Sequence, residues 1–325
     1  MYVISAGCAY PQTVINNAFL AELSPQHPAS YIGEITGIRE RRSVLTPEYL
    51  RERGNIDVRE SLAGSLEGPT ELGCRAAEMA LQRAGIARES VGLILGDCAT
   101  PLQTIPAEAQ RIAAQLSIKV LSYDLPSFSA SLALALQSLS SWKDEKVPDY
   151  VLCVSTNTPT QRVHYRIGGE RLYFGDAAAA VLVSSRMQGK FRLRKAFYGS
   201  DPTRKDSISI PLQGHLDCSS RTMSEISRTD DEMLQRAVEE TQAPLDRVRW
   251  ISGRLEPQSL KQSAAKRGIH IDHVWHTLDR CGNSLGSTVG CVLAERWDKA
   301  ACGDLLVCTF AGIGYSFGYV VLEVL

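Results

Sequence analysis

The fold class is decided by a stretch that predicts a helix and by the strand that follows it. The helical stretch is Glu71-Leu72-Gly73-Cys74-Arg75-Ala76-Ala77-Glu78-Met79-Ala80-Leu81-Gln82-Arg83-Ala84. The apolar residues of this stretch recur with a period near that of a helix, which predicts an amphipathic helix ended by Gly85. A polar turn then leads to the apolar run Val91–Gly96, which is typical of a buried strand. The same order of elements recurs at residues 231–240 and 248–253, nearly half the chain later.

A second echo has a similar offset. Residues 122–124 precede a helix expected over residues 129–141, and residues 277–279 precede a helix expected to start near Ser284. Two echoes at one offset indicate an internal duplication. Because helices alternate with buried strands, we expect mostly parallel sheets covered on both faces, and the duplication predicts two such sheets, stacked and related by pseudo-symmetry.

The chain is therefore expected to consist of two similar halves, residues 1–185 and 186–325. Its 325 residues agree with this division, since about 150 residues are usual for one unit. Two polar segments, residues 43–70 and 199–230, interrupt the pattern and look inserted. Either they shape the mouth of an active site or they are surface excursions, and the sequence leaves both interpretations open.

Charge and composition exclude several classes of protein. The 35 Lys and Arg residues nearly balance the 36 Asp and Glu residues, so there is no electrostatic case for nucleic-acid binding. No apolar stretch reaches the roughly 18 to 20 residues that span a membrane. The nine cysteines are odd in number and form no CxxC pair, and the six histidines lack zinc-site spacing. We expect a cytoplasmic protein without membrane association or a bound metal.

Four short motifs point to a known family when they are taken in chain order. They are Thr36-Gly37-Ile38-Arg39-Glu40-Arg41, Phe174-Gly175-Asp176-Ala177-Ala178-Ala179-Ala180-Val181-Leu182, Asp279-Arg280-Cys281-Gly282-Asn283-Ser284 and Ala311-Gly312-Ile313-Gly314-Tyr315-Ser316-Phe317-Gly318. With them the chain resembles β-ketoacyl-acyl-carrier-protein synthase III of the thiolase superfamily. The resemblance implies a five-layered αβαβα fold, a dimer, and acyl transfer from coenzyme A or an acyl carrier protein, without a tightly bound cofactor, through a Cys, His and Asn triad.

Two of the three triad positions depart from the family pattern. Ser129 stands where the family has its Cys, and no His occurs between His215 and His270, so that Gly253 or Arg254 takes the His position. Asn283 alone matches. Because a condensing enzyme needs His and Asn to stabilise an enolate, the resemblance implies an acyltransferase that uses Ser129. The alternative is a non-catalytic subunit that pairs with an active sister chain.

The resemblance also implies further site residues. His164 is the one candidate for a substitute base, and the backbone N–H groups of Ser129 and Ile313 are expected to form the oxyanion hole. Candidate substrate-binding residues are Tyr31, Arg39 and Arg254.

The family's phosphate-contacting Arg near Tyr31 is replaced by Ile35, which favours a carrier protein over free coenzyme A as donor. The strand at residues 119–123 is expected to pair across a dimer axis, in a homodimer or in a heterodimer with a paralogue.

Overall fold

The computed structural model describes residues 1–218 and 220–325. Within these residues the main sheet has, in spatial order, the strands β12 (Val274–Trp275), β11 (Val248–Ser252), β13 (Leu305–Gly312), β14 (Ser316–Val324), β8 (Phe191–Ser200), β1 (Tyr2–Ala9), β7 (Ala177–Ser184), β6 (Val151–Asn157), β4 (Leu93–Asp97) and β5 (Leu121–Asp124). Two small antiparallel pairs lie outside it, β2 (Thr13–Asn16) with β3 (Glu40–Ser43), and β9 (Ile208–Ser209) with β10 (Asp217–Cys218).

The order and direction of the strands repeat once along the main sheet. From its middle outward, β1-β7-β6-β4-β5 and β8-β14-β13-β11-β12 are matching half-sheets. In each half the last two pairings are parallel and the first two antiparallel. The topology agrees with the duplication inferred from the sequence.

Two details of the predicted sheets are wrong. The half-sheets are mixed rather than mostly parallel, because β7 and β14 each run against both neighbours. They are also joined, since Tyr2 pairs with Arg192 and Val3 with Phe191. The two middle strands, β1 and β8, are each the first strand of their half-sheet in chain order.

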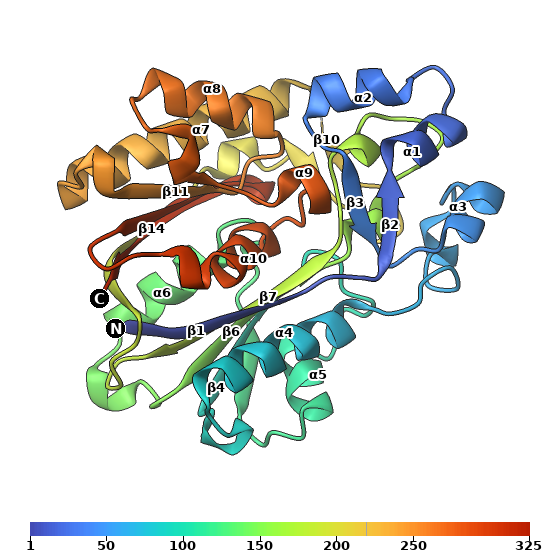
Figure 1. Cartoon of the computed structure of the whole chain (residues 1–325). Coiled ribbons are helices and arrows are strands. Elements are labelled where there is room, and N and C mark those ends of the chain that lie inside the picture. The colour runs from blue at the N-terminus through green and yellow to red at the C-terminus, as the bar shows by residue number, and fades with distance from the viewer. Residues whose placement is uncertain (219) are drawn as a thin grey trace.

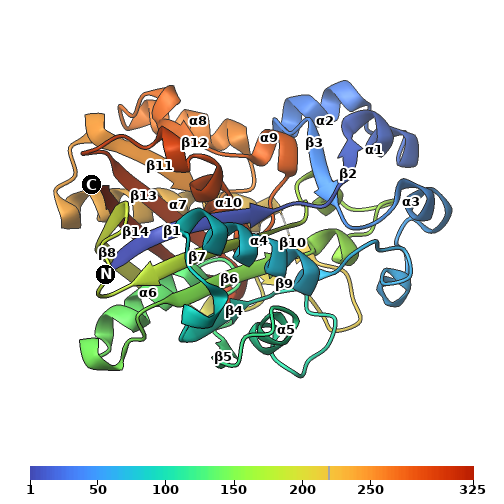
Figure 2. The same cartoon turned by 60° about the horizontal axis from the view of Figure 1, so that its bottom comes forward.

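The helices complete five layers, as Figures 1 and 2 show. Helices α6 and α10 lie between the half-sheets, while α4 and α5 cover one outer face and α7 and α8 the other. The α-helices are α1 (Asn17–Leu23), α2 (Ala29–Thr36), α3 (Pro47–Arg53), α4 (Pro69–Ala84), α5 (Glu108–Gln115), α6 (Ser131–Ser141), α7 (Ser220–Thr241), α8 (Pro257–Lys266), α9 (Leu278–Cys281) and α10 (Ser287–Glu295). The thiolase-like α/β fold class is therefore confirmed. None of the described helices is long and apolar enough to cross a membrane.

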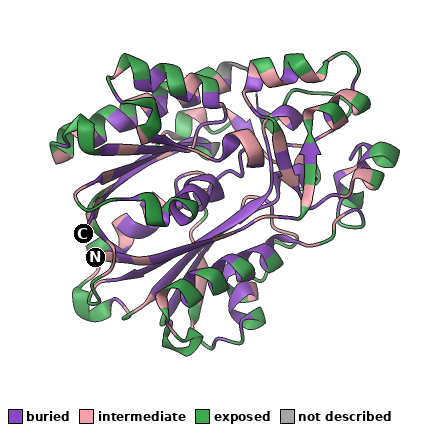
Figure 3. Ribbon diagram, in the orientation of Figure 1, coloured by how far each residue is buried: buried purple, intermediate pink, exposed green. Residues whose placement is uncertain are grey.

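Helix α4 shows how local sequence produces these layers. Pro69 occupies its first turn and Gly85 ends it with a left-handed φ of 65°. Its small buried residues allow close approach to β1, where a Cβ on Gly7 would lie 2.6 Å from the backbone nitrogen of Ala80. Figure 3 shows the result for the whole chain: the strands and α10 are buried, and the outer helices expose one face.

The two segments expected to be inserted are more regular than predicted. Residues 43–70 contain α3, which Thr46 caps by accepting a hydrogen bond from the backbone of Tyr49. Helix α7 begins at Ser220, so the last third of the 199–230 segment is helix. Residues 220–230 are poor helix formers, but Ile226 and Asp230 are buried, and tertiary packing outweighs the weak propensity. The boundary between halves at residues 185 and 186 stays a prediction.

Candidate active site

Ser129 lies in the turn that connects β5 to α6. This turn, residues 127–129, is tight: the backbone nitrogen of Ser129 donates to the carbonyl oxygen of Ser127 at 2.6 Å. Phe128 has a left-handed φ of 52°, a conformation that costs a bulky residue about 1–3 kcal/mol. Surrounding contacts must therefore hold the turn, which we call the Ser129 turn. It places the half-buried Ser129 side chain two residues before Ser131, the first residue of α6.

The last residue of β13 packs against Ser129. A Cβ on Gly312 would lie 2.6 Å from the Cβ of Ser129 and closer still to its hydroxyl oxygen, so only glycine fits. The chain continues through the 3₁₀ turn Ile313–Tyr315, in which Gly314 has a left-handed φ of 89°. The role of the Ile313 N–H in an oxyanion hole stays a prediction.

Ser129 and Asn283 border the same small cavity. The other residues around it are Phe174, Ile208, Ile226, Gly253, Leu255, Leu285, Ala311 and Gly312. Two of these, Ile208 and Ile226, come from the 199–230 segment, so this segment helps to shape the cavity. The lining is apolar apart from Ser129 and Asn283 and contains no ionisable side chain. A general base for Ser129 is therefore absent from the residues that line this cavity.

The Asn283 side chain is engaged by the backbone around it. Its amide nitrogen donates to the carbonyl oxygens of Gly253 at 3.1 Å and Arg254 at 2.9 Å, and its oxygen accepts from the Leu285 nitrogen at 2.8 Å. Its backbone also pairs with the Tyr173–Gly175 stretch, which brings two of the sequence motifs together. Both amide hydrogens are thus used to fix the end of β11 beside the cavity. Its role as a polar partner of Ser129 stays a prediction.

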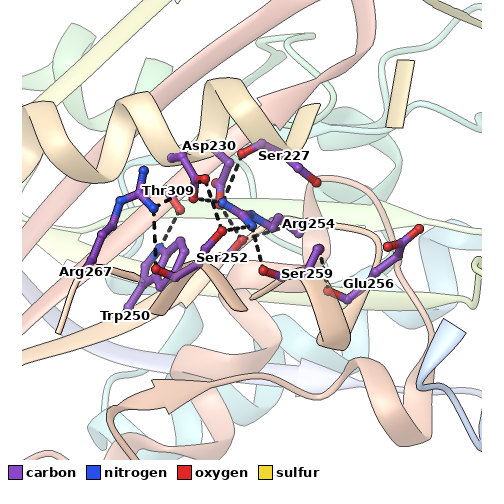
Figure 4. A network of polar contacts seen from close by, with 12 residues as sticks. Ser227, Asp230, Trp250, Ser252, Arg254, Glu256, Ser259, Arg267 and Thr309 are labelled. Carbon is purple, nitrogen blue, oxygen red and sulfur yellow. Dashed lines mark hydrogen bonds and ion pairs between the residues drawn. The ribbon is translucent and has the colours of Figure 1, made fainter. Parts of the chain in front are cut away.

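Arg254 points away from the cavity into a buried network between β11, α7 and α8, shown in Figure 4. Its Nε donates to Asp230 at 2.8 Å, and a second ion pair joins it to Asp231. The remaining donors bind the carbonyl oxygens of Ser227 and Ser259 and the hydroxyl of Ser263. Because every guanidinium donor has a partner, the geometry argues against the substrate-binding role predicted for Arg254.

Gly253, in contrast, borders the cavity that contains Ser129. A Cβ added there would lie 3.5 Å from the carbonyl oxygen of Thr309, its nearest neighbour, which is ordinary van der Waals contact. The sequence left positions 253 and 254 open as the place of the family's His. In the structure, position 253 faces the cavity and position 254 faces the network.

His164 lies outside the Ser129 cavity. Its Nδ1 accepts from the backbone nitrogens of Arg166 at 3.1 Å and Ile167 at 3.3 Å, and its ring centroid is 5.1 Å from that of His215. The Nε2 of His215 lies 2.8 Å from the carbonyl oxygen of Asn55. Burial, followed by the charge of His215, lowers the pKa of His164. His215 thus joins the 199–230 segment to the 43–70 segment, and His164 packs against it. Because His164 lies there and not in the Ser129 cavity, the geometry argues against His164 as the base for Ser129.

A larger groove adjoins the cavity, with Phe174 and Leu255 bordering both. It has a volume of about 380 Å³ and is also lined by Gly169, Glu170, Tyr173, Asp217, Cys218 and Met223. Burial raises the pKa of Tyr173 to about 12, and the charges of Glu256, Cys218 and Tyr31 add to this rise. Tyr31 thus lies within electrostatic reach of the groove. Its ring stacks on that of His27, with the ring centroids 5.9 Å apart. Because Tyr31 is still 47% exposed, it is available to a ligand.

Arg39, the third candidate for substrate binding, forms an ion pair with Asp279 at 2.9 Å. Its side chain is 75% exposed, so the pair contributes little to stability and the guanidinium is accessible. The backbone nitrogen of Arg39 also donates to the Asp279 carbonyl oxygen at 2.7 Å, which ties two of the sequence motifs together. Contact of Arg39 with a substrate stays a prediction.

Sequence reasoning did not single out Asp97, which lies at the carboxyl end of β4 beside the Ser129 turn. The sequence did contain a signal for this residue, because the apolar run Leu93–Asp97 ends in a charged residue, Asp97. The carboxyl ends of parallel strands meet at one edge of a sheet, where sites form. Nothing in the sequence around Phe128 predicts its left-handed φ.

Comparisons with known proteins agree with this geometry. Residues 123–202, which include Ser129, match the family model described as 3-oxoacyl-[acyl-carrier-protein (ACP)] synthase III. The β-ketoacyl-[acyl-carrier-protein] synthase III of Pectobacterium atrosepticum is 26% identical over 329 residues, which cover 97% of each chain.

Solved structures share the fold over nearly the whole chain. The 3-oxoacyl-[acyl-carrier-protein] synthase III of Aquifex aeolicus superposes with a TM-score of 0.86 at 22% identity, covering 99% of each chain. The priming β-ketosynthase of the R1128 polyketide pathway superposes with a TM-score of 0.81 at 19% identity, covering 99% of this chain and 96% of that one. Together, these findings show that the chain is similar over nearly its whole length to 3-oxoacyl-[acyl-carrier-protein] synthase III proteins and that it shares their thiolase-like fold.

Proposed function

We propose that this chain transfers an acyl group from a thioester to an acceptor through Ser129, in fatty-acid-type or polyketide-type biosynthesis. The observation that carries the proposal is the position of Ser129, which lies at the start of α6, against Gly312 and in an apolar cavity. The N-terminus of a helix favours the negative charge that develops on a carbonyl oxygen under attack. An apolar cavity suits the acyl chain itself.

In the proposed reaction, the Ser129 oxygen attacks the thioester carbonyl carbon and the carbon–sulfur bond breaks. The departing thiolate takes the hydroxyl proton and leaves as a thiol, since no ionisable side chain lines the cavity. A nucleophilic acceptor then attacks the resulting ester, and the proton of the acceptor returns to the Ser129 oxygen. Every proton is thereby accounted for without a protein base, at the expense of a slow first step.

Decarboxylative condensation is disfavoured by the same residues. The enolate formed on loss of carbon dioxide needs hydrogen-bond donors, but position 253 is glycine and both amide hydrogens of Asn283 are bound by backbone carbonyls. The charge would develop beside apolar side chains without compensation. We therefore favour acyl transfer over chain elongation.

The donor that we propose is an acylated carrier protein, with acyl coenzyme A as the other source of the same thioester. The groove beside the cavity is the path for the phosphopantetheine arm, because it shares Phe174 and Leu255 with the cavity. Tyr31 can stack on an adenine ring, but Ile35 offers no charge to a phosphate. This combination favours the carrier protein.

Incubation with acylated carrier protein or acyl coenzyme A should give an acyl adduct on Ser129, seen by intact-protein and peptide mass spectrometry. Ser129→Ala should lose the adduct completely, because the only acyl-accepting oxygen in the cavity is removed. Ser141→Ala is the matched control, since Ser141 is an exposed serine at the other end of α6. A folded protein that gives no adduct with short or long donors would reject acyl transfer.

A second candidate function is a non-catalytic subunit that pairs with an active sister chain. It is favoured by the engaged Asn283 amide and by the lack of an ionisable side chain among the described residues that line the Ser129 cavity. A scaffold needs a dimer surface but no reactive cavity. Co-expression with a catalytic paralogue should then convert the chain largely to a heterodimer, whereas an independent enzyme should stay a homodimer.

Both functions predict self-association or pairing through β5. This strand pairs with β4 on one side only and ends the main sheet, and Leu121 on it is 64% exposed. An unpaired edge with an exposed apolar residue is prone to aggregate unless another chain covers it. We therefore expect a dimer interface of more than about 2,000 Å² at this edge.

Leu121→Asp should convert the dimer to a monomer, as measured by size-exclusion chromatography with light scattering. The added charge would be buried in the interface without a partner. Leu245→Asp is the control, because Leu245 is also exposed but precedes β11, near the opposite edge of the sheet. A dimer that survives Leu121→Asp would place the interface elsewhere.

A further inference from the structure

Asp97 is a buried carboxylate that binds the Ser129 turn directly. It is 2% exposed at the end of β4. One carboxylate oxygen, Oδ1, accepts from the backbone nitrogens of Phe128 at 2.9 Å and Ser127 at 3.3 Å. The other, Oδ2, accepts from the hydroxyl of Ser155 at 2.9 Å. Both backbone contacts are made to the two residues that precede Ser129.

These contacts hold a conformation that the turn would not adopt alone. Phe128 keeps its left-handed φ only while its surroundings impose it. The start of α10 closes the other side, where a Cβ on Gly286 would lie 2.7 Å from the carboxylate of Asp97 and closer still to the Phe128 carbonyl oxygen. The turn is therefore fixed between a carboxylate and a helix that permits only glycine at the contact.

A second, small cavity borders this carboxylate. It is lined by Asp97, Ser131, Ser155, Gly286 and mostly apolar residues of the central layers. The two cavities share no lining residue, so Asp97 borders this cavity and not the one that contains Ser129.

We propose that Asp97 is a positioning residue, whose ionised carboxylate holds the Ser129 turn and so keeps the Ser129 hydroxyl in the cavity beside Gly312. The consequence for catalysis rests on the proposed function of Ser129. The contact between Asp97 and the Ser129 turn does not rest on that function, so it can be measured in the absence of any acyl transfer.

The hold depends on pH. Burial raises the pKa of Asp97 from 3.8 to about 6, although hydrogen bonds from Ser155, Phe128 and Ser131 oppose the rise. The titratable neighbours are two thiols, Cys98 next to it and Cys153 across the cavity, and burial raises the pKa of both far above this range. Ser131 of α6 and Gly286 of α10, the elements packed against it, bring no charge. A single transition near pH 6 is expected.

Stability and positioning should move in opposite directions through this transition. Because the folded pKa is raised, the contribution of Asp97 to folding is greatest below about pH 3.8 and is lost as the pH rises to about 6. The charge-assisted hydrogen bonds to the turn are gained as the pH rises through about 6, where the folded-state carboxyl ionises.

Amide hydrogen exchange of residues 127 and 128 tests the proposal. In the wild type, protection of these two amides should rise about 10-fold or more between pH 5 and pH 7, as a hydrogen bond to a charged acceptor forms. Asp97→Ala should lose this protection at both pH values. Asp97→Asn keeps an accepting oxygen but carries no charge, so its protection should match that of the wild type at pH 5 and stay at that level at pH 7.

Asp124→Ala is the matched control. Asp124 also ends a strand and accepts two backbone hydrogen bonds, both at 2.8 Å, but from Glu108 and Ala109 at the start of α5. It should leave the protection of residues 127 and 128 unchanged. Unaltered protection in Asp97→Ala, or a wild type with no pH step, would overturn the proposal; Asp97→Asn decides it if Asp97→Ala does not fold.

The acylation rate of Ser129 separates this proposal from the proposed function. If the wild type is acylated, the rate should fall about 10-fold or more in Asp97→Ala at pH 7 and recover only in part in Asp97→Asn, which keeps an accepting oxygen without the charge. An acylation rate that is unchanged in Asp97→Ala would overturn the positioning role. Absence of acylation in the wild type would reject the proposed function, and the exchange experiment would still decide whether Asp97 holds the turn.

Discussion

Arg254→Ala should destabilise the protein by about 3–5 kcal/mol, the usual loss when one member of a buried ion pair is removed. The reason is the residue left behind, because Asp230 is completely buried and accepts from Arg254 and Ser252. Without the guanidinium its charge would lie unpaired between α7 and β11. Denaturant titration followed by circular dichroism measures the loss.

Two controls separate this effect from the loss of any arginine. Arg51→Ala removes an ion pair with Glu22 in which both side chains are about half exposed, and it should lose little stability. Arg254→Ala combined with Asp230→Ala should recover a large part of the loss, since no unpaired charge remains. A loss in Arg254→Ala no greater than that in Arg51→Ala would contradict the structural role of the network in Figure 4.

Ser129→Cys combined with Gly253→His should increase malonyl decarboxylation about 100-fold over the wild type, the effect of one well-placed donor on developing negative charge. The thiol restores an ionisable nucleophile at the start of α6, and the imidazole supplies the missing donor. Position 253 is chosen because it borders the Ser129 cavity and has room for a Cβ. Release of carbon dioxide from a malonyl thioester is the measurement.

The matched controls are Ser129→Cys alone and Ser129→Cys with Gly253→Ala, which adds the Cβ without the imidazole. Arg254→His in place of Gly253→His should give no gain, because position 254 faces the network and its loss would also destabilise the fold. If the Gly253→His combination folds and shows no gain, the cavity has diverged in shape from that of a condensing enzyme.

Much of the fold could be predicted because its elements are specified locally. Helix α4, strand β4, strand β11 and the echo between the two halves follow from periodicity, from apolar runs and from Gly85 as a helix end. The direction of β7 and β14 could not, since an apolar run reads alike whether its neighbours run parallel or antiparallel to it. The early start of α7 was missed because burial of Ile226 and Asp230, not propensity, stabilises that turn of helix.

By itself the sequence determined the fold class and the repeat of elements between the two halves, since these depend on residue types and their spacing. Only the tertiary structure decided which residues share a space. Gly253 and Arg254 are neighbours in the chain, yet one borders the Ser129 cavity and the other enters the α7 network. Asp97 meets Phe128 across 31 positions. Successive side chains of an extended backbone point to opposite sides, and hydrogen bonds between distant residues depend on how the layers pack.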